Sequence, residues 1–315
     1  MADLQQKPPK KRQRLGLWQA SLATLTLAAA LAGPAALAQP APALVSGSPA
    51  DALRQRQSEL APQLQHNAFG RPLVLESSES DKQLRGNIYA LVDQPFATVG
   101  NALKTPASWC EVLMLHLNTK QCLVQPSGGA ASLAVSVGRK YDQPPEQAQQ
   151  VQFSYAVEAA TDTYLAVRLR ADKGPLSTHD YRISLDAAPA AGGKTFIHLA
   201  YSYAYGTAAR FAMQGYLATL GRDKVGFTAT GTSADGKPTL IGGVRGVVER
   251  NTMRYYLAID AYLASLAQPP AQQAGYRLAA WFDATEQYAQ QLHEVERDDY
   301  LAMKRKELQR THPGS

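Results

Sequence analysis

The sequence predicts an α+β protein in which a curved antiparallel sheet grips a long helix near the carboxyl end. Between about residues 119 and 205, apolar residues recur at every second position in successive runs, a pattern typical of antiparallel strands with one covered face. Residues 247–266 carry apolar side chains at steps of three and four, which indicates an amphipathic helix. The 315 residues are 45% hydrophobic and 18% charged, as in ordinary globular proteins and unlike disordered chains.

The first 38 residues are expected to be a secretory signal peptide. A basic cluster is followed by an uncharged stretch from Leu15 to Ala50, whose most apolar part is 22–32. Gly33-Pro34 interrupts that run, and Ala36-Leu37-Ala38 provides small residues for cleavage. The alternative is a membrane anchor, but a spanning helix needs about 20 apolar residues. We therefore expect cleavage, a periplasmic location and no stable membrane span afterwards.

The net charge does not indicate nucleic-acid binding. The formal charge is +6, but five basic residues and one acidic residue lie in the leader, and the remainder holds 27 basic against 25 acidic residues. A protein that follows a phosphate backbone needs a concentrated basic surface. No such concentration remains, so we expect no nucleic-acid partner.

The elements are expected in a definite order. Residues 39–70 are rich in Ala, Pro, Ser and Gln, which predicts a disordered linker. A domain over 71–267 begins with a strand from about residue 72, a polar turn at 77–82 and a strand at 86–93. Two short helices follow, one after Pro95 and one after Pro106.

The second half of the domain is predicted to be a meander closed by a helix. Runs with alternating apolar residues lie at 133–137, 151–157, 165–170, 181–186 and 197–205. A helix is expected at 206–220, then a hairpin that turns at 235–238, then the long helix at 247–266. A C-terminal helical extension, 268–315, is expected to hold one more helix over about 278–309.

Two cysteines, Cys110 and Cys122, are expected to form a structural disulfide. They lie close in the sequence of a chain that we expect to be exported to an oxidising compartment. The alternative is two buried free thiols. Neither arrangement is catalytic, because there is no C-x-x-C motif, and two cysteines without clustered histidines make a poor zinc site. We expect no metal and no cofactor.

The element order over residues 71–267 resembles the START-like, or helix-grip, superfamily. The residues that carry the resemblance are Gly86–Phe96, which lead into Trp109, and Arg250–Tyr256 in the closing helix. This superfamily includes lipid-transfer domains, pollen-allergen-like proteins and polyketide cyclases. The resemblance implies a gap between sheet and closing helix in which sterols, phospholipids or aromatic polyketides bind. The inserted segment at 206–245 and the tail helix depart from the minimal domain.

Tyrosines are the candidate ligand-binding residues. The chain has 15 of them, and a tyrosine offers apolar surface with one hydroxyl, which suits a mostly apolar ligand. The alternative is that these rings only fill the core. Arg254, at the start of the long helix, is a candidate anchor for a charged headgroup. The candidate site is therefore Tyr155, Tyr201, Tyr203, Tyr256 and Arg254.

Signatures of catalysis are few. The sequence has no G-x-S-x-G elbow, no H-E-x-x-H pair and no glycine-rich phosphate loop. His116, close to Asn118, and Glu249 are the candidate acid–base groups, although a lone histidine is more often structural. His198 is expected on the outer face of the sheet.

The leading hypothesis is a periplasmic carrier or sensor that binds a hydrophobic small molecule, such as a lipid, without catalysis. Two alternatives from other classes remain open. One is a cyclase, dehydratase or hydrolase that uses the same cavity. The other is an interaction protein that binds a protein partner through its tail helix.

Overall fold

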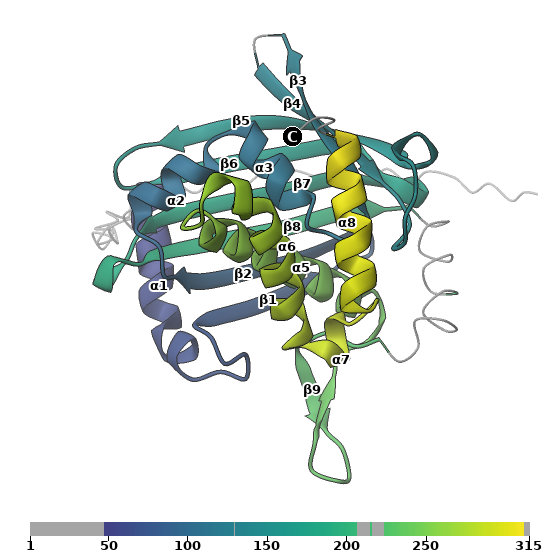
Figure 1. Ribbon diagram of the computed structural model, residues 1–315. Helices are drawn as coiled ribbons and strands as arrows, with labels where there is room; N and C mark the ends of the chain where they lie inside the picture. The colour runs from purple at the N-terminus through teal and green to yellow at the C-terminus, as the bar shows by residue number, and fades with distance from the viewer. Residues whose placement is uncertain (1–46, 129, 207–214, 216–223, 312–315) are drawn as a thin grey trace, which may run out of the picture. The chain divides into compact units, whose positions relative to one another are not determined.

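An eight-stranded antiparallel sheet forms the centre of the structure (Figure 1). The computed structural model describes residues 47–128, 130–206, 215 and 224–311. The strands lie side by side in the order β1-β2-β8-β7-β6-β5-β4-β3. Their bounds are β1 (Leu73–Glu79), β2 (Gln83–Val92), β3 (Thr119–Ser127), β4 (Ala130–Val137), β5 (Gln149–Ala160), β6 (Leu165–Lys173), β7 (Thr178–Pro189) and β8 (Thr195–Tyr205).

The alternating pattern decides which side of each strand is covered. Successive side chains of a strand point to opposite faces. In β2, Leu84 and Ile88 are buried on the inner face, whereas Arg85 is exposed on the outer one. The registers keep the inner faces together, with Ile88 opposite Leu199 and Leu199 opposite Leu185. The expected strands and the α+β class are confirmed, but β1 continues to Glu79, so the turn begins later than expected.

Helices cover the inner face. Figure 1 shows α2 (Phe96–Leu103), α3 (Pro106–Leu113), α5 (Gly243–Ser265), α6 (Pro270–Glu286) and α8 (Arg297–Thr311) on one side of the sheet. The two short helices and the long helix were expected. The long helix α5 lies close to β2, because Gly86 has no side chain to meet Thr252; a Cβ there would collide with the threonine hydroxyl. This is the helix-grip arrangement.

The prediction of a disordered linker over 39–70 is wrong for its central part. Residues Pro49–Gln65 form helix α1, which begins with a capping box between Ser48 and Asp51. Its apolar residues, Leu53, Leu60 and Leu64, pack with outward-facing side chains of the sheet, among them Phe196. The helix forms because this face has apolar surface to bury, and α1 covers part of the outer face.

The prediction of one tail helix over 278–309 is also wrong. The segment consists of α6, the short α7 (Ala289–Leu292) and α8, because the backbone leaves the helical conformation at Tyr288 and again at His293. The turns between them bring Trp281 of α6 and Tyr300 of α8 together, with ring centroids 5.1 Å apart. Both rings are buried in the same apolar core as the sheet, so the core continues across residue 267.

The segment between β8 and α5 is described only in part. The helix expected at 206–220 falls almost entirely outside the described residues. The expected hairpin is confirmed as β9 (Ala229–Thr232) and β10 (Pro238–Leu240). Three 3₁₀ turns, at 145–147, 175–177 and 191–193, connect strands of the large sheet. Within the described ranges, no helix is long and apolar enough to cross a membrane.

Candidate functional site

A cavity of about 160 Å³ lies between the inner face of the sheet and α5. Its apolar lining comes mainly from α3, β4 and β5. Its polar lining comes from the loop after α3, from β7 and β8, and from α5. The lining residues are Leu113, His116, Asn118, Thr119, Val135, Val137, Val151, Phe153, Pro175, Tyr181, Tyr201, Asn251 and Tyr255.

His116 is a buried polar side chain on the cavity wall. The side chain is 8% exposed, and its Nε2 is one of four buried side-chain atoms in the described chain without a hydrogen-bond partner. Its other ring nitrogen, Nδ1, accepts a hydrogen bond of 3.2 Å from the backbone N–H of Asn118. An acceptor at Nδ1 places the proton of a neutral imidazole on Nε2. His116 is therefore a buried, unpaired N–H donor on the cavity wall.

The surroundings keep His116 neutral. Burial holds the pKa of His116 well below its usual value, and the positive charges of Arg254, Lys304 and Lys140 lower it further. The nearby Asn251 side chain opposes this effect. A neutral Nε2–H in a positive potential suits a ligand atom with a lone pair or a negative charge. It does not suit general-base catalysis, because the one basic lone pair of the neutral ring, on Nδ1, already accepts the hydrogen bond from Asn118.

Tyrosine rings line the cavity beside His116. Tyr201 of β8 lies 5.1 Å from Tyr255 of α5 and 6.3 Å from Tyr181 of β7, measured between ring centroids. Tyr255 in turn lies 5.3 Å from the His116 ring. Burial raises the pKa of Tyr201, Tyr181 and Tyr255. All three hydroxyls therefore stay protonated and can donate a hydrogen bond.

Three constraints fix the loop that carries His116. The disulfide between Cys110 and Cys122, confirmed with a Cα–Cα distance of 5.2 Å, spans the segment from α3 to β3. On α8, the Tyr300 hydroxyl donates to the carbonyl oxygen of Leu115 at 2.9 Å. The Lys304 ammonium donates to the carbonyl oxygens of His116 and Thr119, each at 2.7 Å. The tail helix thus holds part of the cavity wall in place.

Lys304 belongs to a buried charge cluster. Its side chain, that of Glu307 and that of Lys120 are all fully buried, and Glu307 accepts a hydrogen bond of 2.8 Å from each lysine. A buried charge is tolerated only when it is paired and hydrogen-bonded. The cluster joins α8 to β3 at the end of the cavity where His116 lies.

The structure brings some of the predicted tyrosines together. Tyr201 lines the cavity, and Tyr203 lies next to it, stacked on Tyr181 with a centroid distance of 5.2 Å. Tyr155 is buried on the same sheet face, and its hydroxyl has no hydrogen-bond partner. Tyr256 is buried elsewhere, near Asp260 and Arg71, and it is not part of the cavity lining.

Arg254 and Glu249 have structural partners. The Arg254 guanidinium, 5% exposed, donates to Glu294 at 3.0 Å and to the carbonyl oxygen of Leu292 at 3.2 Å. The buried Glu249 carboxylate accepts hydrogen bonds from the backbone N–H groups of Phe227 and Thr228 and from two hydroxyls. Both residues therefore hold loops, and neither lines the cavity.

The sequence analysis did not single out Tyr181, Asn251 or Tyr255 as site residues. The sequence did contain a signal for Tyr181. The alternation in β7 places Tyr181 on the same face as Tyr201 and Arg182 on the other face. Asn251 and Tyr255 are four residues apart on α5, next to the apolar stripe through Thr252 and Tyr256. Neighbouring helical residues point about 100° apart, so the stripe indicated the wrong side of α5 for the cavity.

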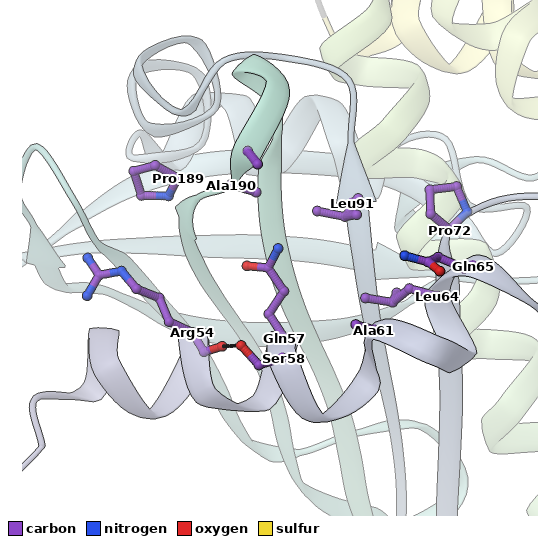
Figure 2. A pocket seen from close by; sticks show the side chains of 11 residues that line it. Arg54, Gln57, Ser58, Ala61, Leu64, Gln65, Pro72, Leu91, Pro189 and Ala190 are labelled. Carbon is purple, nitrogen blue, oxygen red and sulfur yellow. Dashed lines mark hydrogen bonds between the residues drawn. The ribbon is translucent and has the colours of Figure 1, made fainter.

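Larger hollows on the surface lack such a donor. Figure 2 shows one of about 420 Å³ between α1 and the outer side of the sheet, where Arg54, Gln57 and Gln65 lie near Leu91 and Pro189. Another, of about 450 Å³, lies beside α2. None of the four unpartnered buried atoms of the described chain belongs to either hollow. Within the described ranges, no group of three or more His, Cys, Asp or Glu side chains could hold a metal ion.

Comparisons with known proteins give only distant structural likenesses. No family model matches the sequence, and no curated protein matches it. A truncated norcoclaurine synthase from Thalictrum flavum is 11% identical, with a TM-score of 0.32, over 46% of this chain and 91% of that one. A conserved protein from Geobacillus kaustophilus is 11% identical, with a TM-score of 0.34, over 57% and 95%. Ara h 8.0201 is 10% identical, with a TM-score of 0.32, over 61% and 99%. At such scores the ligands and reactions of these proteins carry no weight for this chain.

Proposed function

We propose that this protein binds a small, mostly apolar molecule in the cavity between the sheet and α5, and that it does so in the periplasm. The observation that carries the proposal is the unpaired Nε2–H of His116 on the wall of a cavity that also has an apolar lining from α3, β4 and β5. A buried donor without a partner costs about 1–3 kcal/mol. A ligand that supplies an acceptor recovers that free energy.

The size of the cavity selects the class of ligand. Its volume of about 160 Å³ is close to that of an apolar cavity of roughly 150 Å³ that binds benzene. Sites for drug-sized ligands measure about 300–1,000 Å³. The cavity therefore favours a single ring with one acceptor, such as an aromatic ketone, over a whole sterol or phospholipid.

The periplasmic part of the proposal rests on the leader sequence and on the disulfide. The leader has the pattern of a cleavable signal peptide. The disulfide between Cys110 and Cys122 is of a kind that persists in oxidising compartments. Fractionation of the native host, followed by mass determination of the mature amino terminus, tests this part. An intact leader on cytosolic protein would contradict it.

A cavity-filling variant tests the site. Val137 lines the cavity, and Val137→Phe places a ring in the space that the ligand would take. Val124→Phe, on the exposed part of β3, is the matched control. Calorimetric titration with acetophenone should show saturable binding to the wild type and the control, and a loss of at least tenfold in affinity in Val137→Phe. Equal binding by all three proteins would place the ligand elsewhere, and no binding to the wild type would contradict the proposal.

A further inference from the structure

The outer face of the sheet has a hollow of about 200 Å³ that the proposed function does not use. Four arginines line it: Arg85 of β2, Arg168 and Arg170 of β6, and Arg182 of β7. Small side chains of β7 and β8 form its floor, namely Ser184, Ala200 and Ser202. We refer to these seven residues as the arginine hollow.

Strand register places three of the arginines in one row. Arg85 is opposite Ser202, Ser202 is opposite Arg182, and Arg182 is opposite Arg170. Like charges directly opposite each other in a sheet are destabilising, and Arg170 and Arg182 form such a pair. The small Ser202 leaves open space between Arg85 and Arg182. The arginines of this row therefore repel one another, and an anion bound between them would relieve that repulsion.

Arg168 has a structural role beside this row. It is half-buried, and it donates to the carbonyl oxygens of Val167 and Leu185 at 3.0 and 3.1 Å. It also pairs with Asp186 at 2.7 Å and with Glu158 at 3.0 Å. These contacts engage all three nitrogens of the Arg168 guanidinium. Arg168 therefore forms part of the wall of the hollow and is not expected to bind a ligand.

The other three arginines are held only by weak surface contacts. Arg170 pairs with Glu158 at 3.2 Å, and Arg182 pairs with Asp180 at 3.0 Å, with all four side chains between 43% and 58% exposed. Arg85 donates to the Asn87 amide oxygen at 3.3 Å. Exposed ion pairs contribute only about 0–1 kcal/mol, so a ligand can displace both carboxylates.

We propose that the arginine hollow binds the phosphoryl group of a small molecule. A guanidinium matches a phosphate oxygen pair in a bidentate geometry. A phosphoryl group carries up to two charges on three free oxygens, which suits Arg85, Arg170 and Arg182 with the hydroxyls of Ser184 and Ser202 at the floor. A carboxylate carries one charge and two oxygens, which cannot engage three arginines equally. This site lies on the face opposite the ligand cavity and is independent of it.

Titration with inorganic phosphate at constant ionic strength tests the proposal. The double variant Arg170→Gln/Arg182→Gln should lose at least tenfold in phosphate affinity. Arg54→Gln/Arg297→Gln is the matched control, because it removes two exposed arginines that pair with aspartates elsewhere. Ser202→Leu fills the floor without a change in charge and should also lose phosphate binding.

Each outcome decides the proposal. Saturable binding to the wild type and the control, with a loss in both hollow variants, supports it. The absence of saturable phosphate binding to the wild type would overturn it. An equal loss of phosphate affinity in the control variant would also overturn it, because the binding would then depend only on the net charge of the protein. A second arm with phosphatidic acid in phosphatidylcholine vesicles identifies the source. Vesicle binding that depends on Arg170 and Arg182, together with phosphate binding, indicates a lipid phosphate, whereas phosphate binding alone indicates a soluble ester. Vesicle binding without phosphate binding overturns the proposal.

Discussion

The backbone amide of Asn118 decides what His116 can do. Because this N–H donates to Nδ1, the imidazole presents Nε2–H to the cavity. The sequence analysis considered His116 as a base, and the geometry favours a donor. In the described chain this donor has no hydrogen-bond partner, so it is available to an oxygen atom of a ligand.

His198 provides a residue-scale test of stability against pH. It lies on the outer face of the sheet, as expected, but it is largely buried there, stacked on Tyr89 at a centroid distance of 4.3 Å. Burial lowers the pKa of His198 to about 4, although Asp186 opposes this. Between about pH 6.5, the usual histidine pKa, and pH 4, the unfolded chain binds more protons than the folded one, so acidification favours unfolding. We expect the free energy of unfolding to fall by on the order of 3 kcal/mol from this residue.

The measurement is urea unfolding of the wild type and His198→Gln at several pH values. Glutamine does not titrate, so its curve should fall less steeply as the pH drops from 6.5 to 4. The difference between the two curves isolates His198 from the carboxylates, which titrate in both proteins. Parallel curves would show that His198 has an ordinary pKa in the folded state.

Residue patterns predicted part of the site. Alternation in β8 placed Tyr201 and Tyr203 on the inner face, and both are there. Tyr256 and Arg254 were chosen from the same helix, but α5 turns them toward Arg71 and Glu294. Sequence periodicity defines faces of a helix, whereas the choice between neighbouring faces depends on which elements pack around it.

At the scale of elements, the contact between β2 and α5 depends on Gly86. A Cβ at this position would collide with the Thr252 side chain. Gly86→Ala should therefore force α5 away from the sheet and lower the free energy of unfolding by about 1–3 kcal/mol, as overpacked cores do. Guanidinium unfolding measures this change.

Two further variants check the cause. Gly231→Ala in β9 is the matched control, since no atom lies within 4 Å of a Cβ built there, and it should leave stability unchanged within about 0.5 kcal/mol. Adding Thr252→Ala to Gly86→Ala should recover part of the lost stability, because it removes the colliding hydroxyl. A Gly86→Ala protein as stable as the wild type would refute the close approach.

The C-terminal helix α8 is predicted to be held by its buried charges. Glu307→Gln would leave the ammonium groups of Lys120 and Lys304 facing each other in the interior. Loss of one partner of a buried ion pair costs about 3–5 kcal/mol. We expect a loss of this size in urea unfolding, whereas Glu296→Gln, at a carboxylate that is 83% exposed, should have almost no effect. Similar stabilities for the two variants would contradict the buried cluster.

Most elements were predicted from the sequence, but helix α1 and the break in the tail helix were missed. The strands, the hairpin and the long helix follow from local periodicity and turns. For α1, the Ser48–Asp51 capping box and the spacing of Leu53, Leu60 and Leu64 were usable signals, masked by the composition of the preceding segment. The break at Tyr288 has no Pro or Gly signal in the sequence. It depends on tertiary contacts, such as the bond from the Tyr288 hydroxyl to the Phe69 carbonyl oxygen at 2.8 Å.

For the whole molecule, the disulfide links stability to the shape of the cavity. The segment that it closes contains Leu113, His116, Asn118 and Thr119, all on the cavity wall. Cys110→Ser/Cys122→Ser should lower the free energy of unfolding by about 2–4 kcal/mol. It should also weaken acetophenone binding, because the wall loses one of its constraints. Calorimetry of the folded double variant checks both effects, and unchanged ligand affinity would show that α8 alone fixes this wall.

The central claim is that the cavity binds a single-ring ligand through an acceptor that meets the His116 Nε2–H. The most direct measurement compares the affinities of acetophenone and ethylbenzene, which differ at the acceptor, in the wild type and in His116→Phe. A ratio of affinities cancels any general loss of stability in the variant. The wild type should prefer acetophenone by about fivefold to tenfold, from one net hydrogen bond, and His116→Phe should bind both ligands equally. An equal preference in both proteins would show that another group receives the ligand, and it would contradict the role assigned to His116.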